Sequence, residues 1–335
     1  MAMEKVVIIG DGGWGTAVAI LLCRKGYQVH IWSRFEQYAR VMAEKRENIK
    51  FLPGIMLPPE IIIETQLETI FSGAILAVNA VPTQYLRDVT RMMKPYYPND
   101  LLLVSLTKGI ENDTLYRMSQ VLHEELGPSR LAILSGPSHA EEVAKAVPTS
   151  VVVSSEKADV ASETQSVFNT ERFRVYTNAD LIGVELGGAM KNVVAIAAGI
   201  SDGLGYGTNA KAALLARGLV EIARLGCAMG AQAKTFYGLS GLGDLVTTCF
   251  SGFSRNRRIG ELLGQGMELE KALGSTEMVV EGVKTAKSVY ALAEKYQVEM
   301  PIAEKIYQVL YEGFSPREGV QQLMVRSPKS EMEEW

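Results

Sequence analysis

Residues 5–25 read KVVIIGDGGWGTAVAILLCRK, and this stretch decides the fold of the first half of the chain. Its consecutive β-branched apolar residues predict a buried strand, and the apolar pattern after the glycines predicts a helix. The glycines between them, at residues 10–15, have the order G-x-G-x-x-G. A glycine loop that follows a strand and opens a helix predicts a dinucleotide-binding site. The same motif without this context is often only a turn.

The glycines of this loop have separate tasks. Gly10 permits the tight turn after the strand, Gly12 lets a pyrophosphate approach the backbone, and Gly15 lets the helix pack closely on the strand. The first turn of the helix offers free N–H groups and a partial positive charge to the phosphates. Gly13 and Trp14 complete the loop, and we expect Trp14 to pack over the loop or over the cofactor.

The end of the next strand bears on the choice between NAD and NADP. An NAD-selective site usually carries an acid there, about 20 residues after the glycine loop, to bind the ribose 2′-hydroxyl. This chain has Ser33 and Arg34 instead, and Glu36 follows on the next helix. A guanidinium pairs well with a 2′-phosphate. We therefore favour NADP over NAD; the alternative is that Arg34 is an exposed surface residue.

Apolar runs and helical patterns alternate in the first half of the chain, as in a sheet covered by helices on both faces. The runs that predict strands lie at 6–9, 29–32, 74–78, 101–105, 131–134, 151–153 and 173–176. From about residue 180 the pattern is helical, with segments at 181–200, 209–229, 255–263, 283–296 and 302–312. We predict an α/β protein with an N-terminal doubly wound, Rossmann-like domain over residues 1–180 and an all-helical domain over residues 181–335.

Composition narrows the classes of protein. With 335 residues, 47% of them hydrophobic, the chain has enough apolar mass for two cores. A net charge of −4 gives no basis for nucleic-acid binding. No apolar run approaches the length of about 20 residues that a membrane span needs. The three scattered cysteines fit reduced thiols of a cytoplasmic protein, and with three histidines they show no metal-ligand spacing.

A lysine stands inside the most apolar helical segment. Residues 181–200 read LIGVELGGAMKNVVAIAAGI, in which Glu185 and Lys191 are the only charges. Burial removes water from an ammonium and lowers its pKa, which suits a lysine to proton transfer near neutral pH. The alternative is a lysine that extends from the edge of a packed helix into water.

Two loops that follow predicted strands carry polar groups. Lys108 stands just past one strand, and the sequence LSGPSHA at 134–140 follows the next. Ligands of doubly wound sheets bind at the carboxyl ends of the strands. Both loops are therefore candidates for substrate binding.

The helical half adds a carboxylate and an anion site. Asp244 stands between glycines and apolar residues in GLGDLVTT, and Ser254, Arg255 and Asn256 open a helix. Serine is a good N-cap, and a guanidinium at a helix N-terminus suits a phosphate. A nucleotide site together with a lysine, an aspartate and an anion site indicates hydride transfer to a small anionic carbonyl compound.

Long stretches of the chain resemble the bacterial-type NAD(P)-dependent glycerol-3-phosphate dehydrogenases. The matching stretches are GDGGWGTA, FLPGIMLP, LTKGIE, LSGPSHAEEVAKAVPT, GVELGGAMKNVVAIAAGISDGLGYGTNAKAALLARG, GLSGLGDLVTTCFSGFSRN and VVEGVKTA. The resemblance implies interconversion of sn-glycerol 3-phosphate and dihydroxyacetone phosphate with NAD(P)H, mainly towards glycerol 3-phosphate for phospholipid synthesis. It also implies a cytoplasmic homodimer with a triose-phosphate substrate.

The resemblance assigns roles to matching positions. It implies that Lys191 donates and accepts the proton, with Asp244 orienting it, and that Lys108 neutralises the substrate phosphate or polarises the carbonyl. It implies substrate binding by Lys108, Gly136, Ser138, Lys191, Asp244, Ser254, Arg255 and Asn256. It implies cofactor binding by Gly10, Gly12, Gly13, Trp14, Gly15, Arg34, Lys108, Ala140, Arg255, Val279 and Glu281.

The sequence allows more than one interpretation for His139 and for the function of the whole chain. His139 stands where the family pattern has an apolar residue; we expect a packed or hydrogen-bonded histidine, and assistance in catalysis is the alternative. Arg257 and Arg258 are expected on a solvated helix face. For the whole chain, the alternatives are a related two-domain hydroxy-acid dehydrogenase and a non-catalytic dinucleotide-sensing protein.

Overall fold

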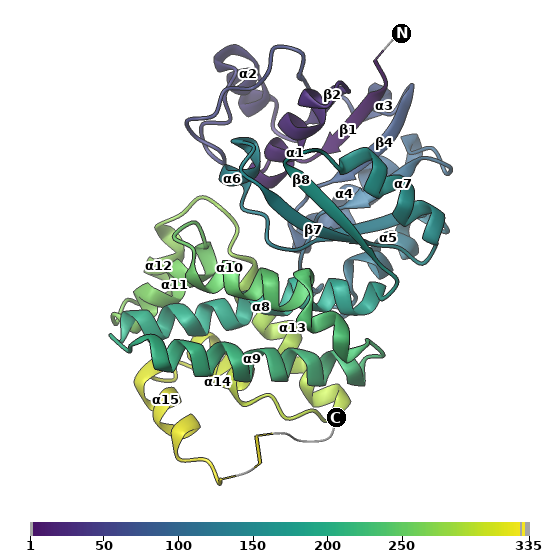
Figure 1. Ribbon diagram of the computed structural model, residues 1–335. Coiled ribbons are helices and arrows are strands. Elements are labelled where there is room, and N and C mark those ends of the chain that lie inside the picture. Colours follow the sequence, from purple (N-terminus) through teal and green to yellow (C-terminus); the bar gives the residue numbers. More distant parts are fainter. Residues whose placement is uncertain (1–2, 329, 332–335) are drawn as a thin grey trace. The chain divides into compact units, whose positions relative to one another are not determined.

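The chain forms two compact units in the computed structural model, which describes residues 3–328 and 330–331 (Figure 1). The first unit comprises residues 1–108 and 116–181, and the second comprises residues 109–115 and 182–335. A division near residue 180 was anticipated. The excursion of residues 109–115 into the second unit was not, because nothing in their composition marks it.

The first unit is built on an eight-stranded sheet in the order β3-β2-β1-β4-β5-β6-β7-β8. All neighbouring strands are parallel except β6 and β7. The strands are β1 (Lys5–Ile9), β2 (Gln28–Trp32), β3 (Ile62–Glu64), β4 (Ala74–Asn79), β5 (Leu102–Ser105), β6 (Arg130–Ser135), β7 (Thr149–Ser154) and β8 (Phe173–Asn178). The predicted α/β class is confirmed, with β3 as an additional short edge strand.

The direction of winding reverses between β1 and β4. The strands after β1 lie on one side of it, whereas β4 and its successors extend on the other side. Because crossovers are right-handed, the helices before and after this reversal cover opposite faces of the sheet. Ligands bind beyond the carboxyl ends of the strands at such a reversal. The glycine loop that follows β1 lies at this place.

The helices of the first unit pack in pairs as well as on the sheet. Helix α1 contacts α6, and α4 contacts α5. The helices are α1 (Gly13–Arg24), α2 (Glu36–Lys45), α3 (Leu67–Ile70), α4 (Leu86–Met93), α5 (Met118–Leu126), α6 (Ala140–Ala144) and α7 (Ala158–Phe168), with short 3₁₀ turns η1 (Thr83–Tyr85) and η2 (Lys94–Tyr96).

The elements found among the described residues of the second unit are all helices or helical turns. The helices are α8 (Leu181–Gly203), α9 (Thr208–Ala228), α10 (Asp244–Phe250), α11 (Arg255–Gly264), α12 (Leu269–Gly274), α13 (Glu281–Tyr296), α14 (Pro301–Tyr311) and α15 (Pro316–Met324). The 3₁₀ turn η3 (Ala233–Tyr237) and the π-helical turn η4 (Leu239–Gly243) precede α10. Figure 1 shows α8 and α9 side by side in this unit, and both contribute to one apolar core.

Helix α8 corrects one expectation from the sequence. By length and composition it is apolar enough to cross a membrane, although no apolar run was expected to approach that length. However, 94% of its most apolar window is buried inside the protein. A helix that is apolar on all sides and buried is typical of the core of a large globular protein.

Helices α8 and α11 cross with their backbones in contact. A Cβ added to Gly199 would lie 1.9 Å from the carbonyl oxygen of Arg257, and one added to Gly260 would lie 2.0 Å from that of Ile196. Only glycine allows so close an approach. The crossing fixes the start of α11 relative to the helix that carries Lys191.

Candidate active site

The glycine loop has the geometry of a phosphate cradle. Gly10 has a φ of +107°, and a Cβ on Gly15 would lie 2.7 Å from the Gly10 oxygen, so α1 begins directly against the loop. A Cβ on Gly12 would meet no atom within 4 Å, so open space lies beside that residue. Among the described residues, nothing bonds the buried Nε1–H of Trp14. These residues fit a dinucleotide whose pyrophosphate lies at the N-terminus of α1.

Two other predicted cofactor residues lie near this loop or near the end of β2. The Cβ of Ala140, the first residue of α6, lies 3.8 Å from a Cβ built on Gly13. Arg34 is exposed two residues after β2 ends. Between them the structure reveals a contact that the sequence did not indicate: the Ser33 hydroxyl donates a hydrogen bond to Asp11 Oδ2, at 2.5 Å.

Lys108 lies among predicted substrate residues of the first unit. Its Nζ donates to the Gly136 carbonyl oxygen at 2.8 Å and to Ser138 Oγ at 3.3 Å. The Ser138 hydroxyl in turn donates to the same Gly136 oxygen at 2.9 Å. The structure thus brings Lys108, Gly136 and Ser138 together beyond β5 and β6. His139 follows them as the half-buried residue that precedes α6.

In the second unit, Lys191 forms a buried ion pair with Asp244. The Lys191 ammonium donates to Asp244 Oδ1 and, at 2.8 Å, to Thr248 Oγ1. The Thr248 hydroxyl donates to the Asp244 carbonyl oxygen at 2.6 Å. Lys191 is 7% exposed and Asp244 is 1% exposed, so the alternative of a lysine extended into water does not hold.

Close packing around two glycines places Asp244 beside Lys191. A Cβ on Gly187, one turn before Lys191 in α8, would lie 2.7 Å from the Ser240 carbonyl oxygen. A Cβ on Gly241 would lie 2.1 Å from the Phe236 oxygen. A side chain at Gly187 would separate α8 from η4, and one at Gly241 would separate η4 from η3; either would move the turn that precedes Asp244. Single π-helical turns of this kind are frequent at functional sites.

The cluster of Lys191, Asp244 and Thr248 holds a charged amine beside a carboxylate and a hydroxyl. A buried ammonium is costly unless an opposite charge lies at hydrogen-bond distance, and Asp244 supplies that charge. The neighbouring thiol is not a competing nucleophile: burial raises the pKa of Cys249 to about 12, so the thiol stays protonated. The Lys191 nitrogen can therefore exchange a proton with a ligand without competition from this thiol.

The start of α11 is fixed by polar contacts. Ser254 caps the helix, as predicted, by accepting the backbone N–H of Arg257 at 3.2 Å. The amide of Asn256 donates to Asn192 Oδ1 and accepts from the backbone N–H of Gly282, both at 2.9 Å. Asn192 directly follows Lys191, so α8, α11 and α13 are joined next to the buried pair.

The arginines of α11 differ in their contacts. Arg255 donates from Nη1 to the carbonyl oxygen of Val279 at 2.8 Å, which brings two predicted cofactor residues together. Glu281, another predicted cofactor residue, is the first residue of α13. Arg257 pairs through Nε with Asp202 at 2.8 Å and is half-buried, so the prediction that it lies on a solvated helix face is wrong. Arg258 is exposed, as predicted.

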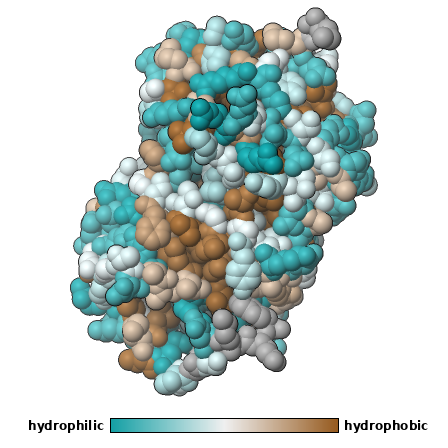
Figure 2. Space-filling model, viewed as in Figure 1, coloured by the Kyte–Doolittle hydropathy of each residue, from teal (hydrophilic) through white to brown (hydrophobic). Residues whose placement is uncertain are grey.

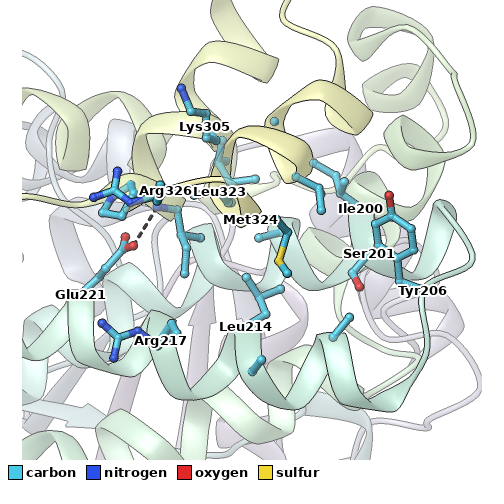
Figure 3. Close-up of a pocket in the computed structure, with 18 of the residues that line it drawn as sticks. Ile200, Ser201, Tyr206, Leu214, Arg217, Glu221, Lys305, Leu323, Met324 and Arg326 are labelled. Atoms are coloured by element: carbon cyan, nitrogen blue, oxygen red, sulfur yellow. Dashed lines mark hydrogen bonds between the residues drawn. The ribbon is translucent and has the colours of Figure 1, made fainter. Parts of the chain in front are cut away.

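A large apolar pocket also lies in the helical unit, apart from Lys191 and Asp244. It has a volume of about 820 Å³ and is lined by α8, α9, α14 and α15 (Figure 3). Glu221 lies in its wall and binds the first N–H groups of α14. Among the described residues, no three His, Cys, Asp or Glu side chains form a group that could hold a metal ion.

A doubly wound sheet with a phosphate cradle, and a helical unit with a buried lysine–aspartate pair, define the class of the NAD(P)-dependent dehydrogenases with a separate helical domain. Sequence comparison narrows the class. The N-terminus model of NAD-dependent glycerol-3-phosphate dehydrogenase matches residues 5–161, and the C-terminus model matches residues 180–321. The chain belongs to this family, and the predicted oxidoreductase class with an NAD or NADP cofactor is confirmed.

Individual relatives agree with this assignment. The chain is 52% identical to a glycerol-3-phosphate dehydrogenase [NAD(P)+] of Pelotomaculum thermopropionicum, over 98% of this chain and 95% of the relative. It is 50% identical to the enzyme of the same name from Geobacillus thermodenitrificans, over 98% and 97%. The crystal structure of glycerol-3-phosphate dehydrogenase from Coxiella burnetii superposes with a TM-score of 0.94 at 38% identity, over 97% of this chain and 99% of that one.

Proposed function

We propose that this protein interconverts dihydroxyacetone phosphate and sn-glycerol 3-phosphate, and so supplies glycerol 3-phosphate for phospholipid synthesis. The observation that carries the proposal is the buried Lys191–Asp244 pair in a chain of this family. The glycine loop and the N-terminus of α1 would hold a nicotinamide dinucleotide, which would supply hydride-transfer chemistry in both directions. The remaining chemistry belongs to side chains of the protein.

Lys191 performs the proton transfer in this proposal. During reduction of a ketone, negative charge grows on the carbonyl oxygen. The Lys191 ammonium stabilises that charge and then donates its proton to the oxygen, and in the reverse direction it takes the proton back. Asp244 orients the amine and keeps it charged until the proton is needed, while Thr248 fixes a second N–H direction. Acid–base help of this kind is worth on the order of 10²–10⁴ in rate.

The substrate phosphate and hydroxyls need their own partners. Lys108, with Gly136 and Ser138 beside it, supplies a positive charge and a hydroxyl in the first unit. Ser254, Arg255 and Asn256 supply donors at the N-terminus of α11. We assign these two groups to substrate binding, with Arg255, Val279 and Glu281 also on the cofactor side.

The test is a comparison of substrates with purified protein. NADPH and NADH oxidation is followed by absorbance, first with dihydroxyacetone phosphate and then with a 2-keto acid. Turnover of the triose phosphate alone is expected. Turnover of the keto acid alone would replace the proposal by a hydroxy-acid dehydrogenase, and binding of the dinucleotide without turnover of either would indicate a sensing protein.

We further propose that the protein is a cytoplasmic homodimer. Large apolar side chains are exposed around α10, namely Leu242, Val246, Phe250 and Phe253, and Figure 2 shows apolar residues gathered on the helical unit. Patches of this kind mark interaction surfaces. Light scattering is expected to give twice the mass of one chain, and a monomer at micromolar concentration would contradict the assignment.

A further inference from the structure

An acidic side chain does lie at the end of β2, but it comes from the glycine loop and not from β2. Ser33 occupies the position that carries the ribose-binding acid in NAD-selective sites, immediately after the strand. Its hydroxyl donates to Asp11 Oδ2 at 2.5 Å. Asp11 thus places a carboxylate one hydrogen bond away from the usual position of that acid.

The backbone around Asp11 is fixed on both sides. Asn48, which is fully buried, donates from Nδ2 to the Asp11 carbonyl oxygen and to Thr16 Oγ1, both at 2.7 Å. The Gly10 N–H donates to the Trp32 carbonyl oxygen at 3.1 Å, which ties the loop to β2. The backbone that carries Asp11 is therefore fixed by the fold, and the hydrogen bond from Ser33 orients its carboxylate.

The carboxylate also remains accessible. Asp11 is half-buried, whereas Ser33 is fully buried beneath it. Across residues 3–328 and 330–331, the Ser33 hydroxyl is the one side-chain group bonded to the Asp11 carboxylate. An oxygen of this carboxylate is thus available to a ribose hydroxyl.

Charge decides which ribose suits such a site. An ionised carboxylate accepts a hydrogen bond from a 2′-hydroxyl, but it repels a 2′-phosphate. Arg34 is next to Ser33 and is exposed, so its attraction for a 2′-phosphate is screened by solvent. Asp11 belongs to the glycine loop and is less exposed than Arg34, so solvent screens its charge less.

We propose that Asp11 sets the cofactor selectivity of this enzyme: its carboxylate, oriented by Ser33, binds the 2′-hydroxyl of NAD(H) and disfavours the 2′-phosphate of NADP(H). The inference rests on the proposed function only in that the glycine loop holds the dinucleotide. It reverses the preference for NADP that the sequence of β2 alone indicates.

The experiment measures cofactor binding without substrate, by fluorescence titration of the full-length protein with NADH and with NADPH. Burial raises the pKa of Asp11, which the Ser33 hydrogen bond opposes, so the titration is made near pH 8 to keep the carboxylate ionised. The wild-type protein is expected to bind NADH more tightly. Asp11→Asn keeps an acceptor for Ser33 but removes the charge, and it should move the NADPH-to-NADH affinity ratio towards NADPH by roughly ten- to a hundredfold.

A matched control is Glu36→Gln, which removes an acid from the start of α2 that is already paired with Arg40. It should leave the affinity ratio unchanged. If Asp11→Asn weakens both cofactors equally, Asp11 only maintains the loop and the proposal is overturned.

A second measurement needs no variant. Competition on the wild-type protein should show tighter binding of AMP than of adenosine 2′,5′-bisphosphate, and the opposite order would also overturn the proposal. A protein that binds NADH selectively but does not turn over dihydroxyacetone phosphate would instead contradict the proposed function.

Discussion

At the scale of single residues, the site depends on how Lys191 is surrounded. The sequence singled out this lysine because it stands in an apolar segment, and the resemblance paired it with Asp244. The hydroxyl of Thr248 completes the arrangement, since it lies one turn after Asp244 on the same face of α10. The four-residue spacing of Asp244 and Thr248 allows Thr248 to contact Lys191. The contact forms because α8 packs closely against η4.

Lys191→Ala should abolish most turnover while leaving the cofactor bound. We expect kcat to fall on the order of 10²–10⁴ because the proton donor is lost. Binding of NADH, measured by fluorescence titration, should be unchanged. Lys234→Ala, which removes an exposed lysine of η3, is the control and should behave as wild type. A near-normal kcat for Lys191→Ala would assign the proton to another group.

Thr248→Val should reduce kcat without affecting cofactor affinity. Valine keeps the shape of threonine but removes the oxygen that accepts the Lys191 hydrogen bond, and a hydrogen bond to a charged group is worth about 1.5–3 kcal/mol. We expect a loss of about tenfold or more in kcat. Thr248→Ser restores the hydroxyl and should recover most of the activity; a Ser variant as impaired as the Val variant would show that the hydroxyl does not account for the loss.

At the scale of elements, the helical unit depends on contacts between helix ends and helix backbones. Glu221 of α9, which is labelled in Figure 3, accepts the backbone N–H groups of Ile302 at 2.7 Å and of Ala303 at 3.1 Å. These groups have no partner within α14, because the first N–H groups of a helix lack an acceptor inside it. Burial raises the pKa of Glu221 to about 7. The two hydrogen bonds and two nearby arginines act in the opposite direction, but their effect is smaller.

The raised pKa predicts a pH dependence of stability. The folded state keeps a proton on Glu221 that the unfolded chain has released, so this contribution to stability is present below about pH 4.5 and is lost as the pH rises through about 7. We therefore expect the difference in unfolding free energy between wild type and Glu221→Gln to fall by roughly 3 kcal/mol from acid to neutral pH. Urea unfolding at several pH values measures it, and a constant difference would refute the shift.

The crossing of α8 and α11 predicts a sharp difference between two glycines. Gly260→Ala would place a methyl group 2.0 Å from the Ile196 carbonyl oxygen, and such overpacking costs about 1–3 kcal/mol or more. Gly274→Ala, at the end of α12, meets no atom within 4 Å and should change the unfolding free energy by less than about 1 kcal/mol. Thermal unfolding of both variants tests this, and equal effects would contradict the crossing.

At the scale of the whole molecule, the sequence predicted the strands and helices that have a clear pattern of apolar residues. The buried strands were found because their residues are apolar without interruption. The edge strand β3 was missed because it is short and Ile62 is 39% exposed, so its pattern resembles a loop. Likewise, no element was predicted over residues 239–243, whereas in the structure they form the π-helical turn η4, which packs against α8.

The local sequence also identified some residues of the predicted site and missed others. Motifs identified the glycine loop, Lys191 and Asp244, because each stands out in its local sequence. The contact of Asp11 with Ser33 escaped detection, because the two residues lie on neighbouring strand ends that only the parallel pairing of β1 and β2 brings together. Contacts between distant residues are set by register and close packing, which a local pattern does not contain.

The excursion of residues 109–115 limits how this protein can be dissected or recombined. Ile110 is fully buried in the helical core, and the hydroxyl of Ser288 in α13 donates to Asn112 Oδ1 at 2.6 Å. A fragment ending at residue 180 would expose Ile110 on a bare loop, and the complementary fragment would be left with a hole beside α13. The two halves therefore cannot be exchanged independently between related enzymes. Split proteins, chimeras and circular permutants should keep residues 109–115 together with the helices that enclose them.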